Sequence, residues 1–137
     1  MAKTLGNLGC AYGALGDFAK ARDLLERSLA IEERAYGRDH PGVAKTLGNL
    51  GNAYGNLGDH AKMRDMLERV LAINERAYGR DHLKVAVTLY NLGMVYGDLG
   101  EHAKKRDMLE RALAIQERTY GPGHPHAKHY RNVLNTM

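Results

Sequence analysis

A repeat of 42 residues constrains this chain more than any other feature of its sequence. The blocks Lys3–Ala44 and Lys45–Ala86 differ only at positions 10, 14, 18, 21, 24, 28, 32, 41 and 42 of the first block. A third block, Val87–Lys128, follows the same pattern more loosely. A fixed period of this length is typical of proteins that stack small units, because each unit buries its apolar face only against its neighbours.

Each block carries the pattern of two helices. The apolar positions of the first helix in the second block are Val43, Leu47, Leu50, Tyr54 and Leu57. Their spacing of three and four residues places them on one helical face. Gly58 and Asp59 predict a turn followed by an N-cap, so a second helix should run from about residue 60 to 78. On its outer face we expect Asp65 to pair with Arg69, four residues further on.

Glycines and histidines recur at fixed places in the blocks. Gly9, Gly51 and Gly93 lie inside predicted first helices, and we interpret them as sites of close helix packing. Gly13, Gly55 and Gly97 also lie inside these helices, where packing and ligand access are both open explanations. His40, His82 and His124 follow the second helices, and their periodicity indicates a loop structure, for example a ring hydrogen bond that closes the turn.

Together these motifs resemble those of the tetratricopeptide repeat (TPR) family. The segment Leu8-Gly9-x-x-Tyr12, followed by Gly16, Ala21 and Leu25, has the TPR spacing. The 42-residue form, which ends in Tyr-Gly-x-x-His-Pro-x-Val-Ala, resembles the repeats of kinesin light chains. The resemblance implies an all-α fold, a right-handed α-solenoid of three antiparallel helix pairs plus a C-terminal capping helix. We expect one domain over 1–137, with units 3–44, 45–86 and 87–128 and the capping helix at about 125–136.

The chain departs from the family pattern at the start of the second helix. The small residue of the family is Ala21 in the first unit, but Met63 and Lys105 stand there later. We expect Lys105 to direct its charged end outward, with looser helix packing around it.

The resemblance also implies a binding surface, because the first helix of each pair lines a concave groove in TPR proteins. The corresponding positions here are Lys3, Asn7, Lys45, Asn49, Asn52, Asn56, Val87, Tyr90, Asn91 and Met94. Asparagine amides both donate to and accept from a peptide backbone, lysines attract carboxylates, and Gly6 and Gly48 leave room for a ligand backbone. We therefore expect an extended peptide or protein segment, acidic near the first two units and apolar near the third. The alternative is that near-identical units repeat solvated asparagines through shared origin.

Several function classes are not expected. The formal charge is +4, but basic residues alternate with acidic ones, which argues against a nucleic-acid surface. No apolar run is long enough for a membrane span, and Cys10 as the only cysteine favours the cytoplasm. His124, His126 and His129 lack a completing metal ligand nearby. No catalytic constellation and no cofactor motif is found, so we expect neither enzyme activity nor a cofactor.

A second function remains open alongside the groove. The first helix pair has no capping segment before it, so the chain could self-associate by end-to-end stacking through its N-terminal repeat. This feature fits both a piece of a longer array and an engineered chain. The close similarity of the first two blocks fits recent duplication as well as design.

Overall fold

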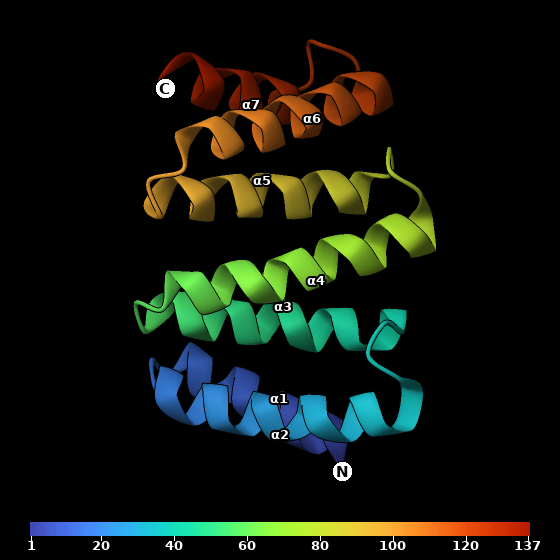
Figure 1. The fold of residues 1–137 in the computed structure, drawn as a ribbon, viewed down its shortest axis with the longest axis vertical. Coiled ribbons are helices and arrows are strands. Elements are labelled where there is room, and N and C mark those ends of the chain that lie inside the picture. Colours follow the sequence, from blue (N-terminus) through green and yellow to red (C-terminus); the bar gives the residue numbers. More distant parts are fainter. The chain divides into compact units, whose positions relative to one another are not determined.

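The computed structural model describes residues 1–137, which form seven helices and no strands (Figure 1). The helices are α1 (Ala2–Ala14), α2 (Phe18–Tyr36), α3 (Pro41–Asn56), α4 (His60–Tyr78), α5 (Leu83–Asp98), α6 (His102–Tyr120) and α7 (Pro125–Asn135). The predicted all-α class is confirmed, and both the second helix of the middle block and the final capping helix lie where the repeat predicted them. None of the helices has the length and apolar character needed to cross a membrane.

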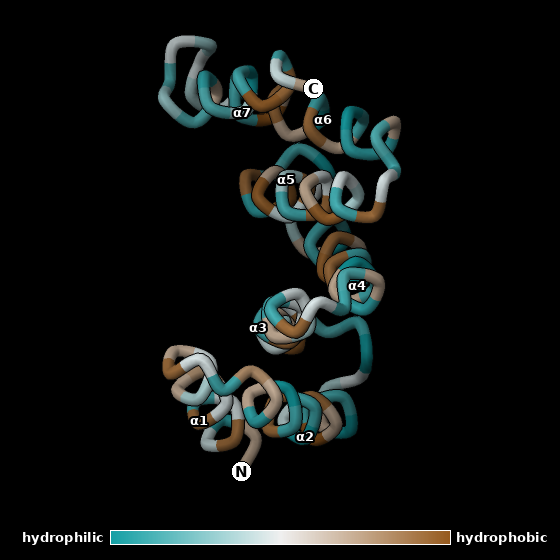
Figure 2. Tube along the Cα trace, turned by 90° about the vertical axis from the view of Figure 1, so that its left-hand side faces the viewer, coloured by the Kyte–Doolittle hydropathy of each residue, from teal (hydrophilic) through white to brown (hydrophobic).

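The chain divides into two compact units, Met1–Ile73 (unit 1) and Asn74–Met137 (unit 2), and the boundary falls within α4. In unit 1, α2 packs against both α1 and α3. Figure 2 shows α1 and α3 on one side of this unit and α2 and α4 on the other. In unit 2, α6 packs against α5 and α7. The single domain over 1–137 stays a prediction.

Short turns join the two helices of each pair. Gly16 adopts a φ of 84°, a left-handed conformation that glycine tolerates best. The Asp17 carboxylate then caps α2 by accepting a hydrogen bond from the Lys20 amide at 3.2 Å, and Asp59 caps α4 in the same way. Glu101, at the same place before α6, makes no capping bond. The third turn therefore lacks a contact that the first two have.

The periodic histidines are helix caps. His40 Nδ1 accepts a hydrogen bond from the Gly42 amide at 2.9 Å, and the rings of His82 and His124 accept equivalent bonds at 3.1 and 3.2 Å. Each ring also stacks on the tyrosine that ends the preceding helix, as His40 does on Tyr36 at 5.1 Å between centroids. The predicted ring hydrogen bond is therefore confirmed: it begins α3, α5 and α7.

Two sets of glycines set the packing within helix pairs. A Cβ added to Gly9 would lie 2.9 Å from Leu25 Cγ, and one added to Gly93 would lie 3.2 Å from Leu109 Cγ. At Gly51 the nearest atom, Met66 Cβ, would be 3.4 Å away. Because α2 and α6 lie this close to α1 and α5, the prediction of close helix packing is confirmed.

The other set, Gly13, Gly55 and Gly97, faces the variable position of the second helix. A Cβ on Gly13 would meet only the Cβ of Ala21, at 3.8 Å. A Cβ on Gly55 would overlap the Met63 sulfur, and one on Gly97 would lie 2.8 Å from Lys105 Cδ. Gly55 and Gly97 thus make room for the long side chains of Met63 and Lys105, and packing accounts for them.

The buried core of unit 1 runs through the three helices α2, α3 and α4. It consists of Leu25, Leu29, Val43, Leu47, Leu50, Tyr54, Val70 and Ile73. One expected contact is wrong: Arg69 does not pair with Asp65 but reaches α2, where its guanidinium lies 2.6 Å from Glu33 Oε2. Asp65 lies beside Arg64 instead. The ion pair between α2 and α4 forms in place of the expected pair within α4, because the side chains of Glu33 and Arg69 are partly buried against each other.

Candidate functional site

A cavity of about 230 Å³ opens between α1 and α3 in unit 1. Helix α1 forms one wall with Lys3, Gly6, Asn7 and Cys10, and α3 forms the other with Gly42, Lys45, Thr46 and Asn49. Residues of α2, among them Ser28 and Glu32, form the floor. The structure therefore brings four of the predicted groove residues, Lys3, Asn7, Lys45 and Asn49, into one cavity.

The floor and the walls of this cavity differ in their hydrogen bonding. On the floor, Ser28 Oγ lies 2.9 Å from the Ala2 carbonyl oxygen, and Glu32 Oε1 accepts a hydrogen bond of 2.5 Å from Thr46 of the α3 wall. On the walls, Lys3, Asn7 and Lys45 have no hydrogen-bond or ion-pair partner in the chain. The polar groups of the floor are thus satisfied, whereas Lys3, Asn7 and Lys45 on the walls are available to a ligand.

A second cavity of about 230 Å³ continues along the same side of unit 1, towards the C-terminal ends of α1 and α3. Asn49, Asn52 and Asn56 line it from α3, opposite Cys10 and Gly13 of α1. Asn49 donates to Cys10 Sγ at 3.4 Å, and Asn56 donates to the carbonyl of Asn52 at 2.9 Å. We call the two cavities together the α1–α3 groove. It presents all six predicted residues of the first two repeats.

Chemically, the α1–α3 groove offers two cations and unpaired amides beside small residues. Each cavity is smaller than the roughly 300–1,000 Å³ of pockets for drug-sized ligands. Each is suited to one or two side chains. An extended peptide laid between α1 and α3 can place a side chain in each cavity and meet asparagine amides along its backbone.

The predicted residues of the third repeat lie on α5 in unit 2. Val87 and Met94 are 50% and 36% exposed, and Asn91 is also exposed. Tyr90 is different, because its hydroxyl lies 2.9 Å from His129 Nε2 and its ring stacks on Tyr130 at 4.7 Å between centroids. This face is more apolar than the α1–α3 groove, as the sequence predicted, but Tyr90 is partly engaged by α7.

Sequence reasoning missed the contribution of α7 to this face. The buried Tyr130 stacks against Tyr90, and burial raises its phenol pKa above the ordinary value of 10.0. Repulsion from Tyr90 acts in the same direction, while a hydrogen bond from Gln116 lowers the pKa. The histidines of this end form stacked and hydrogen-bonded pairs with aromatic rings, and no group of three or more metal-binding side chains is found.

Comparison with known proteins places these observations in a family. The tetratricopeptide repeat model matches residues 1–62 and again 43–117, which together cover most of the chain. Curated protein sequences give no match.

Solved structures share the fold. The nearly identical TPR-like repeats of a putative kinesin light chain from Podosopora anserina superpose with a TM-score of 0.84 at 25% identity, over 98% of this chain and 64% of that one. BtubC from P. vanneervenii gives 0.89 at 22% identity, over 98% and 54%. The Sgt2 TPR domain from Aspergillus fumigatus gives 0.69 at 20% identity, over 98% and 77%. The chain thus spans less than two thirds of the first two structures.

The family match agrees with the helix pairs, the glycines at their crossings and the repeated caps described above. This chain belongs to the tetratricopeptide repeat family.

Proposed function

We propose that this chain is a scaffold that binds an extended, acidic segment of another protein in the α1–α3 groove. TPR repeats commonly mediate protein interaction, and this chain has the repeat fold. The proposal places the function in the cytoplasm, in keeping with the single, unpaired cysteine. It assigns binding, and no catalysis, to the polar residues of the groove.

One observation carries this proposal: unpaired donors converge on a cavity whose floor is already satisfied. Lys3 and Lys45 project from different helices into the same cavity, beside Asn7 and Asn49. Two cations on opposite walls attract a carboxylate more strongly than either alone, and neither lysine forms an ion pair within the chain. The Glu32 carboxylate on the floor of the same cavity already accepts hydrogen bonds from Ser28 and Thr46. The asparagines add donors and acceptors for the backbone on either side of that carboxylate.

The exposed apolar residues of α5 form a separate candidate surface within unit 2. Val87 and Met94 offer an apolar contact with room to adapt, since methionine is flexible and polarisable. An apolar residue of a partner would bury its surface there. We propose that Tyr90 and Asn91 contribute to this α5 surface, with the Tyr90 ring held in place by α7.

Peptide display against the full chain tests the proposal. A random library of ten-residue peptides should yield binders enriched in Asp and Glu, and their affinity should fall as salt rises because screening weakens exposed charge pairs. Asn49→Ala should weaken a selected peptide by roughly fivefold for one lost hydrogen bond, and Asn91→Ala tests the α5 surface of unit 2 in the same way. Lys45→Ala should weaken binding and flatten its salt dependence.

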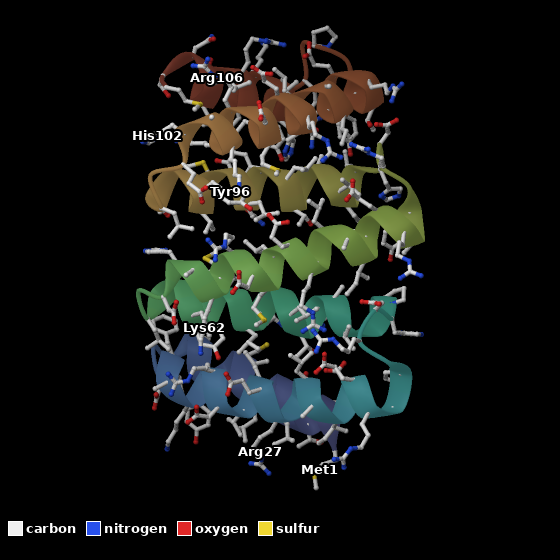
Figure 3. All side chains as sticks on the ribbon, in the orientation of Figure 1. Met1, Arg27, Lys62, Tyr96, His102 and Arg106 are labelled. Atoms are coloured by element: carbon white, nitrogen blue, oxygen red, sulfur yellow. The ribbon has the colours of Figure 1, made fainter.

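A matched control is available in unit 1. Lys62 is exposed and lies over the Tyr54 ring, 5.1 Å from its centroid, outside both cavities of the groove (Figure 3). Lys62→Ala removes the same charge as Lys45→Ala but should leave affinity within about twofold, as expected for a distant exposed charge. Equal losses from the two variants, or selected peptides without acidic residues, would contradict an acid-binding groove.

Self-association is a second candidate function. Leu8 and Ile31 are exposed at the N-terminal end of unit 1, which favours a partner of some kind at that end. If that partner were a second copy, light scattering should show dimers or longer arrays whose population grows with concentration. A mass that stays monomeric across the micromolar range would favour the groove as the functional surface.

A further inference from the structure

The side chain of Tyr90 fills a place within unit 2 whose equivalent within unit 1 is an open cavity. Two repeats of 42 residues relate α5, α6 and α7 to α1, α2 and α3. By this register Tyr90 stands at the place of Gly6, which lines the first cavity of the α1–α3 groove. A phenol ring is therefore present where the first unit has no side chain.

The contacts of the Tyr90 ring match the lining of that cavity. The Tyr90 hydroxyl lies 2.9 Å from His129 Nε2, and the ring stacks on Tyr130 at 4.7 Å between centroids and 11° between planes. His129 stands at the place of Lys45, and Lys45 lines the first cavity from α3. Tyr130 stands at the place of Thr46, which lines it as well. The ring thus connects α5 and α7 across the position that is open between α1 and α3.

The second helix of each unit also differs at this place. Ala112 stands where unit 1 has Ser28, and Gln116 stands where it has Glu32. Both residues are buried, at 0% and 2% exposure, and Gln116 bonds to Tyr130. A methyl group and a neutral amide therefore replace the hydroxyl and the carboxylate of the first cavity. Such a lining is suited to an aromatic ring.

We propose that Tyr90 is the built-in occupant of a ligand site between α5 and α7. The class of ligand that fits this site is a planar aromatic ring with a hydroxyl group beside His129. The Tyr90 ring closes the site to a side chain of a partner, so that ligand side chains enter between α1 and α3. The site itself rests on the contacts of Tyr90, and its part in the choice of groove rests on the proposed function.

Tyr90→Ala opens the site and keeps a residue with high helix propensity in α5. Loss of the half-buried ring should lower the unfolding temperature by about 5–10 °C. Phenol is the probe, and it should bind this variant with a dissociation constant on the order of 1 mM. At a tenfold excess over that constant, phenol should raise the unfolding temperature of the variant by about 5 °C.

The ring signals of His129 in NMR spectra locate the bound phenol, since this ring lies beside the Tyr90 hydroxyl in the unmodified chain. In Tyr90→Ala they should shift in proportion to phenol bound. In the unmodified chain and in Tyr90→Phe, which keeps a ring in the site, they should stay in place. Tyr78→Ala is a matched control, because the Tyr78 ring is 41% exposed and stacks on His82. Phenol should not restore the stability of that control.

The converse variant tests the choice of groove. Gly6→Tyr brings the same ring into the first cavity, and a Cβ at Gly6 would lie 3.4 Å from Ser28 Oγ, an ordinary contact. This variant should weaken a display-selected acidic peptide by roughly tenfold or more, because the ring takes the place of a ligand side chain. Tyr90→Ala should leave the same affinity within about twofold, since the change is distant from the α1–α3 groove.

A folded Tyr90→Ala chain that binds no phenol would overturn the proposal, as would equal shifts of His129 in the unmodified chain. If Tyr90→Ala does not fold, nuclear Overhauser contacts between the rings of Tyr90 and Tyr130 in the unmodified chain decide, and their absence would overturn the closed site. Full peptide affinity in Gly6→Tyr would remove the role in groove choice. Failure of peptide display would refute the proposed function alone, because phenol binding requires no peptide.

Discussion

Gly48 offers the sharpest way to separate stability from binding in this molecule. It lies inside α3 but lines neither cavity of the α1–α3 groove, and a Cβ built on it would meet open space. Packing therefore does not require glycine there, in contrast to Gly51 and Gly55 of the same helix. A side chain added there should also stay clear of a ligand in the α1–α3 groove.

Gly48→Ala should stabilise the protein. Glycine in a helix interior is about 1 kcal/mol less favourable than alanine, and the open space around the new methyl group adds no clash to offset the gain. For a chain of this size, 1 kcal/mol corresponds to a rise of roughly 3–6 °C in the unfolding temperature. Differential scanning calorimetry measures the shift directly.

The same substitution should leave the affinity of a groove-bound peptide unchanged, because Gly48 lines neither cavity. Gly6→Ala adds a methyl group to the lining of the first cavity and should weaken the peptide by roughly fivefold, the worth of one hydrogen bond. Isothermal titration with a display-selected acidic peptide provides the measurement. Gly55→Ala is the control, because its methyl would overlap the Met63 sulfur and should bring no gain in stability.

Two results would refute this reasoning separately. A lower unfolding temperature for Gly48→Ala would show that the space above α3 is not open. A higher unfolding temperature with a weakened peptide would show that the ligand reaches beyond the two cavities to Gly48.

Further predictions follow from the caps and the buried phenol. His82→Ala should lose the bond to the Lys84 amide and about 1 kcal/mol of stability, whereas Asn at that position should keep most of it, which urea unfolding measures; equal losses would contradict the capping role. Glu101→Asp should gain up to about 1 kcal/mol, because aspartate caps the two equivalent turns, and an unchanged unfolding temperature would count against this. Tyr130 has a raised pKa when folded, so its contribution to stability is complete below pH 10 and is lost as pH rises through the folded pKa. Tyr130→Phe should therefore flatten the fall in urea midpoint between pH 9 and 11, and identical slopes would contradict the assignment.

Much of the fold could be predicted because its determinants are local and repeated. The turn at Gly58 and Asp59, the helix that follows and the close packing at Gly51 each depend on residues within one unit. Repetition supported each of these predictions, since the same residues recur 42 positions apart. The histidine caps could also be anticipated, because their period marked them as part of the loop.

Contacts between helix pairs could not be predicted in the same way. Arg69 has Asp65 and Glu33 as acidic candidates, and only the packing of α4 against the neighbouring pair shows that Glu33 is nearer. The stacking of Tyr90 on Tyr130 depends on where α7 lies, which the loose third repeat did not specify. The packing role of Gly55 had one sign in the sequence, because a bulky Met63 stands where the family has a small residue.

We propose that the groove between α1 and α3 holds the ligand through its asparagines and lysines. Side-chain amide NMR spectra of the full chain, labelled at asparagine and titrated with a display-selected acidic peptide, test it most directly. The amides of Asn7 and Asn49 should shift in proportion to peptide bound, while those of Asn132 and Asn135 on α7 should stay in place. Shifts confined to Asn132 and Asn135, with Asn7 and Asn49 unmoved at saturation, would contradict the account.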